Sequence, residues 1–320
     1  MTSPAAESKR LADRPWCVKP WCAPFLVFLV ACEGLDTSFV GPQPQYVRST
    51  ATQASSSVDW LGERIVVTNA NGNIEVVGVP SAKRIEVDAY PAALATNQAD
   101  ADAAMADVAA QITVTKSDDV YVIACPSARV DHGSALTGGT GCDRLVVHVP
   151  SGSDGQPASI DVDARFGGAK IDGVIGSLRA IASFDVHASV SPTKDATVSV
   201  VNGNDGSTLT CPVVLVVPSS FETSGLLVTS HLENGSHEAI GRAISDFPDL
   251  VTMRCEAAAL RGTFRTIYPG AGPYPCISSP ASHGQGTARA AQIEVLAGLG
   301  DAYILEDASR GPGWSGGRCK

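Results

Sequence analysis

The sequence predicts an all-β fold: a single-domain β-solenoid, or β-roll, of stacked short strands with one inserted helix at about residues 97–112. Three observations lead to this prediction. Runs of alternating apolar and polar residues recur along the chain, turn residues separate them roughly every 8 to 12 residues, and a weak repeat recurs at about 20 residues. A β-sandwich is the alternative, because short strands with frequent turns are also typical of that fold.

Composition agrees with a β-rich exported protein. The chain has 320 residues, of which 44% are hydrophobic and only 18% charged, with 31 Gly and 20 Pro. Small residues and many turns suit an extracellular β domain, and the apolar fraction is sufficient for a packed core. The net charge of −10 argues against nucleic acid as a partner, because binding to phosphate needs clustered Lys and Arg.

Residues 1–31 resemble a secretory signal peptide. A basic leader precedes the apolar run Ala23–Val30, which is too short to span a bilayer. The small residue Ala31 is followed directly by Cys32, as in a bacterial lipobox, so we expect Cys32 to be lipidated and to anchor the chain to a membrane. An ordinary signal segment, with Cys32 incidental, is the alternative.

Residues 32–57 are polar and not periodic, which predicts a flexible tether, and the solenoid domain is expected over residues 58–309. It opens with strands at 64–68 and 73–77, joined by the Asn-Gly turn Asn69–Gly72. A third strand at 84–89 alternates apolar and charged residues.

The helix at 97–112 follows from one apolar face at helical spacing, formed by Ala101, Ala104, Met105, Val108 and Ile112. Asn97 is placed to cap its N-terminus.

Strands resume after the helix and continue almost to the end of the chain. Phe166 and Phe184 are 18 residues apart in similar surroundings, and this spacing favours the solenoid. Residues 310–320 are Gly-rich and predict an irregular tail.

An even number of cysteines outside the leader and Cys32 predicts disulfides in an exported chain. The candidates are Cys125, Cys142, Cys211, Cys255, Cys276 and Cys319. Cys125 with Cys142 is the favoured pair, because both flank a Gly-rich loop between two strand-like runs, while the other pairings stay open. No Cys-x-x-Cys pair or His at ligand spacing occurs there, so we expect no metal and no cofactor.

Three segments resemble strand and turn pieces of the bacterial putative-adhesin domain family: 65–78, 147–152 and 166–171. The likeness covers roughly residues 60–300. It implies a right-handed β-solenoid or β-roll on an envelope protein, and it brings no catalytic residues. The helix at 97–112 and the added cysteines depart from the family's pattern.

Two patterns are candidates for chemistry. Residues 313–317 match the Gly-x-Ser-x-Gly motif of serine hydrolases, but that motif needs a His later in the chain, and the three residues that follow include none. Asp161 and Asp163 share a strand face and could bind calcium or act in glycoside hydrolysis, yet the alternation favours a solvated polar face. We therefore expect no catalytic residue.

Taken together, these features favour a non-enzymatic, lipid-anchored protein of the bacterial cell envelope that presents its solenoid surface for adhesion, binding or structural support. Its expected partners are the membrane and an envelope protein or a polysaccharide. One alternative is a β-helix polysaccharide hydrolase or lyase, which would need Asp161, Asp163 and Asp185 in one cleft. Another is a sensory or assembly partner in the envelope.

Overall fold

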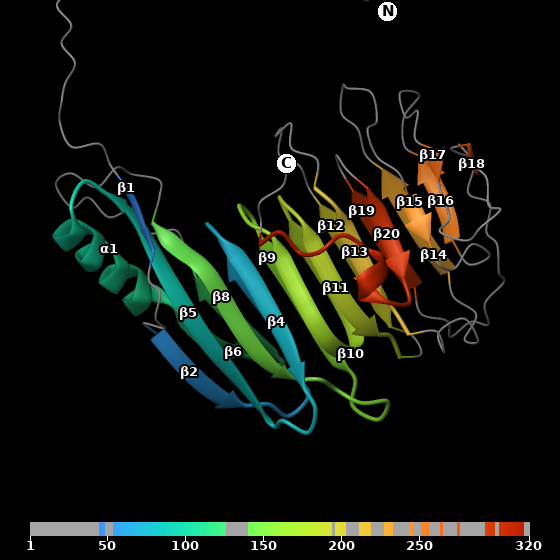
Figure 1. Ribbon diagram of the computed structural model, residues 1–320. Coiled ribbons are helices and arrows are strands. Elements are labelled where there is room, and N and C mark those ends of the chain that lie inside the picture. Colours follow the sequence, from blue (N-terminus) through green and yellow to red (C-terminus); the bar gives the residue numbers. More distant parts are fainter. Residues whose placement is uncertain are drawn as a thin grey trace, which may run out of the picture. The chain divides into compact units, whose positions relative to one another are not determined.

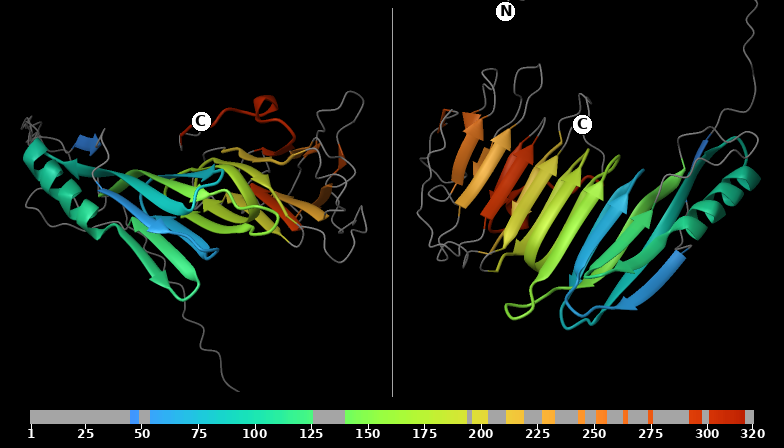
Figure 2. Two further views of the ribbon diagram at one scale, coloured as in Figure 1. Left: turned by 90° about the horizontal axis from the view of Figure 1, so that it is seen from below. Right: turned by 180° about the vertical axis from the view of Figure 1, so that it is seen from behind.

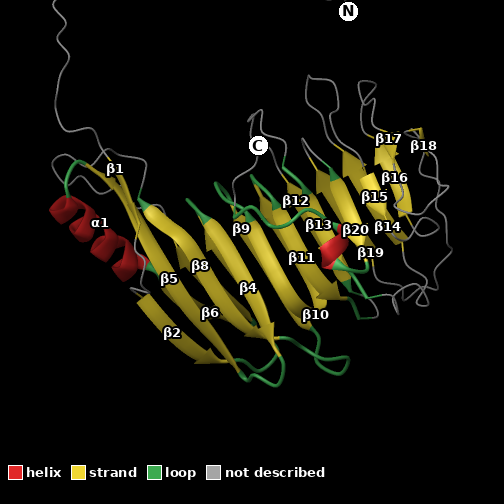
Figure 3. Cartoon of the chain, in the orientation of Figure 1, coloured by secondary structure: helices red, strands yellow, loops and turns green. Residues whose placement is uncertain are grey.

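The computed structural model describes residues 45–48, 54–125, 140–193, 196–202, 211–218, 227–232, 243–245, 251–255, 263–264, 274–275, 292–297 and 301–316. All of them belong to the second of two units, Met1–Gly41 and Pro42–Lys320. They are mostly β-strand, with one α-helix and one short 3₁₀ helix (Figure 3). No helix in these segments is both long enough and apolar enough to cross a bilayer.

Eighteen of the described strands form one hydrogen-bonded network, in which two sheets share strand β10 (Ala169–Ala182). Sheet A begins with β1 (Gln45–Arg48) and β2 (Ala54–Asp59), end to end along β5 (Arg84–Ala95), and continues with β8 (Gly141–Pro150), β4 (Asn73–Val79), the first half of β10, β11 (Val186–Ser191), β13 (Val213–Val216), β20 (Ala302–Leu305) and β15 (Ala243–Ser245). β1 and most of β2 thus fall inside the segment 32–57 that the sequence indicates as a tether.

Sheet B contains, in spatial order, β6 (Thr113–Ser117), β7 (Val120–Cys125), β3 (Arg64–Asn69), β9 (Ala158–Ala164), the second half of β10, β12 (Thr197–Asn202), β19 (Gln292–Ala297), β14 (Leu227–Leu232) and β16 (Val251–Cys255). Two further strands, β17 (Thr263–Phe264) and β18 (Tyr274–Pro275), form a separate antiparallel pair.

The chain repeats one unit, a strand of sheet B followed directly by a strand of sheet A, which we call a rung. Neighbouring rungs pair in parallel, and antiparallel pairing in the network is confined to β5 with β1, β2 and β8, and to β6 with β7. The rungs do not stack in chain order. Rung β3–β4 lies between β7–β8 and β9–β10, and rung β19–β20 lies between β12–β13 and β14–β15 (Figure 1).

The core consists of rows of apolar side chains that run from rung to rung. In sheet B, Ile65 aligns with Ile160, Ile160 with Leu178, and Leu178 with Val198, and none of the four is more than 1% exposed. Burying each large aliphatic side chain contributes about 1.5–3 kcal/mol. The largest fully buried side chains all lie on strands: Ile65, Ile74, Ile85, Ile123, Leu145, Ile160, Ile171, Leu178 and Leu215.

The inserted helix α1 (Gln98–Gln111) is present where the sequence predicts it. Asn97 caps it, because its side-chain oxygen accepts the backbone N–H of Asp100 at 2.9 Å. Four residues of the predicted apolar face are buried, and Ala101, Ala104 and Met105 among them pack against alanines of β5, so the helix covers this end of sheet A. The fifth, Ile112, follows the last helical residue and is only partly buried.

Candidate functional site

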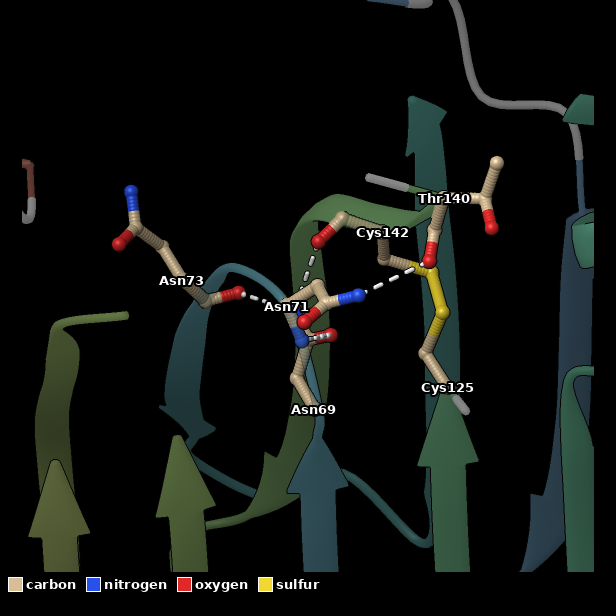
Figure 4. Close-up of a disulfide and its surroundings, with 6 residues drawn as sticks. All are labelled: Asn69, Asn71, Asn73, Cys125, Thr140 and Cys142. Atoms are coloured by element: carbon tan, nitrogen blue, oxygen red, sulfur yellow. Dashed lines mark hydrogen bonds between the residues drawn. A yellow bond between two sulfur atoms is a disulfide. The ribbon is translucent and has the colours of Figure 1, made fainter. Parts of the chain in front are cut away.

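Cys125 and Cys142 form a disulfide, the pairing that the sequence favours, with their Cα atoms 6.1 Å apart (Figure 4). The bond joins the end of β7 to the start of β8 and closes that rung. Cys211 is buried and is also disulfide-bonded. The remaining predicted cysteines, Cys32, Cys276 and Cys319, lie outside the described residues, as does the side chain of Cys255.

Asparagine side chains form hydrogen bonds between neighbouring rungs beside this disulfide (Figure 4). Asn69, fully buried at the end of β3, donates from Nδ2 to the carbonyl oxygens of Asn73 at 3.0 Å and Cys142 at 3.1 Å. Asn71 donates from Nδ2 to the Thr140 carbonyl at 2.9 Å. A buried carbonyl without a hydrogen bond would destabilise the fold. By binding these carbonyls, the two amides stabilise the turns of rungs β3–β4 and β7–β8.

Two glycines let the rungs approach each other at the same turns. A Cβ atom on Gly167 would lie 2.0 Å from the carbonyl oxygen of Gly72, and one on Gly72 would lie 2.1 Å from that of Cys142. The Gly of the predicted Asn-Gly turn is therefore required by the contact between rungs, whereas its φ is not positive and the turn itself does not demand a glycine there.

The carboxylates that an enzyme would need are not brought into one cleft. Asp161 and Asp163 lie on β9 in sheet B, where Asp161 forms an ion pair with Arg64 of β3. Asp185 precedes β11 of sheet A and is fully buried. The first two occupy a partly solvated strand face, as the alternation predicts.

The Gly-x-Ser-x-Gly match does bring Ser315 to a carboxylate and a histidine. Ser315 donates to Oδ2 of Asp185 from its backbone N–H at 2.8 Å and from its hydroxyl at 2.9 Å, while His187 Nε2 is 4.0 Å from the same oxygen. In a serine hydrolase the imidazole contacts the hydroxyl and the carboxylate contacts the imidazole. Here the carboxylate lies between the other two groups, so the geometry serves attachment of the chain.

Residues 311–316, which we call the C-terminal strap, are held by two more side chains of sheet A. Asn73 donates from Nδ2 to the carbonyl of Gly316 at 2.7 Å, and its Oδ1 accepts the backbone N–H of Gly168 at 2.9 Å. The ammonium group of Lys170 lies 5.8 Å from the centre of the Trp314 ring. From the sequence we expected an irregular tail in 310–320, and no local pattern indicated these contacts.

The titration of two groups is perturbed by structural contacts. A hydrogen bond from Lys116 lowers the pKa of the Glu63 carboxyl to about 2, although its side chain is only 8% exposed. Burial lowers the pKa of His187, and the nearby Asp185 only partly offsets this. In the described segments no cluster of three or more His, Cys, Asp or Glu could hold a metal ion.

No family model matches the chain, and no curated protein matches its sequence. Among solved structures, it is similar to a putative cell adhesion protein from Clostridium sporogenes, with 12% identity and a TM-score of 0.43 over 82% of this chain and 99% of that one. It is also similar to a putative adhesin from Parabacteroides distasonis, with 10% identity and a TM-score of 0.28 over 80% of this chain and 98% of that one. A putative adhesin from Bacteroides fragilis has 10% identity and a TM-score of 0.22 over 82% of this chain and 98% of that one.

Proposed function

We propose that this chain is an exported, non-enzymatic protein of the bacterial cell envelope, anchored by an acylated Cys32, whose β-solenoid body presents a surface for adhesion or binding. The observation that carries the proposal is the in-register, parallel alignment of rungs that are neighbours in space. A row such as Ile65, Ile160 and Leu178 is the buried side of a repeat that contacts only its neighbours, which is the property of a solenoid.

The pairing pattern supports a solenoid over a sandwich. Sandwich sheets are antiparallel, whereas antiparallel pairs in the eighteen-stranded network involve only β1, β2, β5, β6 and their partners β7 and β8. These strands, together with α1, lie at the end of the stack where the repeat begins (Figure 1). Solenoids need such atypical elements at their ends to cover an otherwise exposed core.

Disulfide chemistry supports export. Structural disulfides persist in oxidising compartments and are rare in the cytosol. The bond between Cys125 and Cys142 therefore fits a protein that leaves the cytoplasm, as does the sequence around Cys32.

The outward side of sheet A supports a binding surface of fixed shape. Tyr90 of β5 aligns with Arg144 of β8, so their side chains share one face. Arg144 lies 4.1 Å from the centre of the Tyr90 ring and 3.7 Å from the Glu75 carboxylate. Because neighbouring strands fix these positions, a ligand would meet a preformed pattern of charged and aromatic groups.

Three measurements test the proposal. Mass spectrometry of the mature protein should find an acylated Cys32 at the N-terminus, and the Cys32→Ala variant should be released from the membrane fraction. Cells that display the wild-type protein should adhere to envelope polysaccharide or protein more strongly than cells with the variant. An unmodified N-terminus other than Cys32 would remove the anchor, and release of sugar fragments from a polysaccharide would favour the hydrolase or lyase.

A further inference from the structure

The C-terminal strap crosses sheet A on its outer side and connects rungs that do not touch each other. It starts at Gly311, against Leu305 of β20 and Val214 of β13, and ends at Gly316, bonded to Asn73 of β4. In sheet A, β10 and β11 lie between β4 and β13. Figure 2 shows this red segment running outside the strands. A solenoid repeat normally contacts only its neighbours, so this connection is an added feature of the chain.

The strap is received by a built site rather than by a bare strand face. Asp185 is a fully buried carboxylate, and both of its contacts with Ser315 reach the same oxygen. Hydrogen bonds to a charged acceptor are about twice as strong as neutral ones. Two further contacts hold the residues on either side of Ser315: Lys170 lies beside the Trp314 ring, and Asn73 binds the Gly316 carbonyl. The site therefore contacts four groups of an extended peptide: the indole of Trp314, the hydroxyl and backbone N–H of Ser315, and the backbone carbonyl of Gly316.

The strap is attached through side chains and is not paired with the sheet as a strand. Between residues 312–316 and the described strands of sheet A there is no backbone-to-backbone hydrogen bond, so the strap does not add a strand to the sheet. Gly313 and Ser315 are exposed, and Trp314 Nε1 and His187 Nε2 are buried without a hydrogen-bond partner among the described residues. Because no strand pairing holds it, the strap can leave its site as a local opening that does not unfold the sheet.

We propose that the strap exchanges between copies of this chain, so that the strap of one molecule occupies the Asp185 site of another. The intramolecular contact already shows that the site and the strap are complementary, and each other copy of the chain carries an identical strap. Exchange of an identical element is a low-cost route to dimers, and a reciprocal exchange closes as a two-fold pair. A membrane-anchored chain would favour exchange, because anchoring raises the local concentration of partners.

Two variants of the full-length protein, mixed in detergent, test this proposal. One has a defective strap, Trp314→Ala with Ser315→Ala, and keeps the site. The other, Asp185→Asn, has a weakened site and keeps the strap. Native mass spectrometry of the mixture should detect heterodimers in excess of either homodimer, because only the mixed pair combines a working strap with a working site. If both variants are folded and no heterodimer forms, the proposal is overturned.

A peptide measurement decides the question if Asp185→Asn does not fold. A labelled peptide with the sequence of residues 311–316 should bind the strap-defective variant, and the same peptide with Ala in place of the Ser should bind at least about tenfold more weakly. No binding to the strap-defective variant would overturn the proposal. Both measurements are made in solution and do not depend on acylation of Cys32, so their failure is distinct from a failure of the proposed anchor.

Discussion

Replacing Gly167 with Ala should separate two rungs and strongly destabilise the protein. The new Cβ would lie 2.0 Å from the carbonyl oxygen of Gly72, so the two turns would have to move apart by about 1 Å to reach the shortest contact that real Cβ atoms make. Neighbouring strands are about 4.8 Å apart, so this is a large fraction of the spacing.

The cost follows from the contacts at this turn. The hydrogen bonds from Ile74 N–H to the Gly168 carbonyl at 3.0 Å and from Gly168 N–H to Asn73 Oδ1 at 2.9 Å would lengthen to about 4 Å and be lost. Two lost bonds at about 1 kcal/mol each, with about 1–3 kcal/mol of overpacking, give a loss of roughly 3–5 kcal/mol. This is a large part of the 5–15 kcal/mol typical of a folded domain.

Urea unfolding followed by circular dichroism measures this loss. The matched control is Gly155→Ala, because a Cβ at Gly155 meets no atom within 4 Å. We expect the control to unfold within about 0.5 kcal/mol of the wild type. A Gly167→Ala variant as stable as the Gly155→Ala variant would refute the argument that the backbones of adjacent rungs are in contact at this turn.

Four further variants should lose stability in the same urea assay. The double substitution Cys125→Ser with Cys142→Ser should cost about 3 kcal/mol, and its difference from the wild type should vanish under reducing conditions. Glu63→Gln should destabilise the protein at neutral pH, because the folded-state pKa of Glu63 is lowered from 4.5 to about 2. The difference in unfolding free energy between this variant and the wild type should shrink as pH falls through this range, and Lys116→Met should show the same trend. Leu178→Ala, at a side chain that is 1% exposed, should cost about 2–5 kcal/mol, and a smaller loss would argue against a close-packed row.

The local features of this chain could be predicted because they depend on residues close together in sequence. Ile85 and Val87 are buried while Glu86 between them is exposed, as period-two alternation requires. The helix face with Ala104 and Val108 is buried for the corresponding reason at helical spacing. The disulfide pair could be found because its two cysteines flank one loop.

The amino-acid sequence by itself therefore determined the strands, the helix, the Asn-Gly turn and one cysteine pair, each a property of a short segment. Only the tertiary structure decided that rung β19–β20 lies between β12–β13 and β14–β15, and that Ser315 meets Asp185 and Gly316 meets Asn73. These partners are 130 and 243 residues apart. Such contacts leave no periodic pattern in the sequence, because they depend on which rungs pair and in which register, and that is settled only when distant segments pack together.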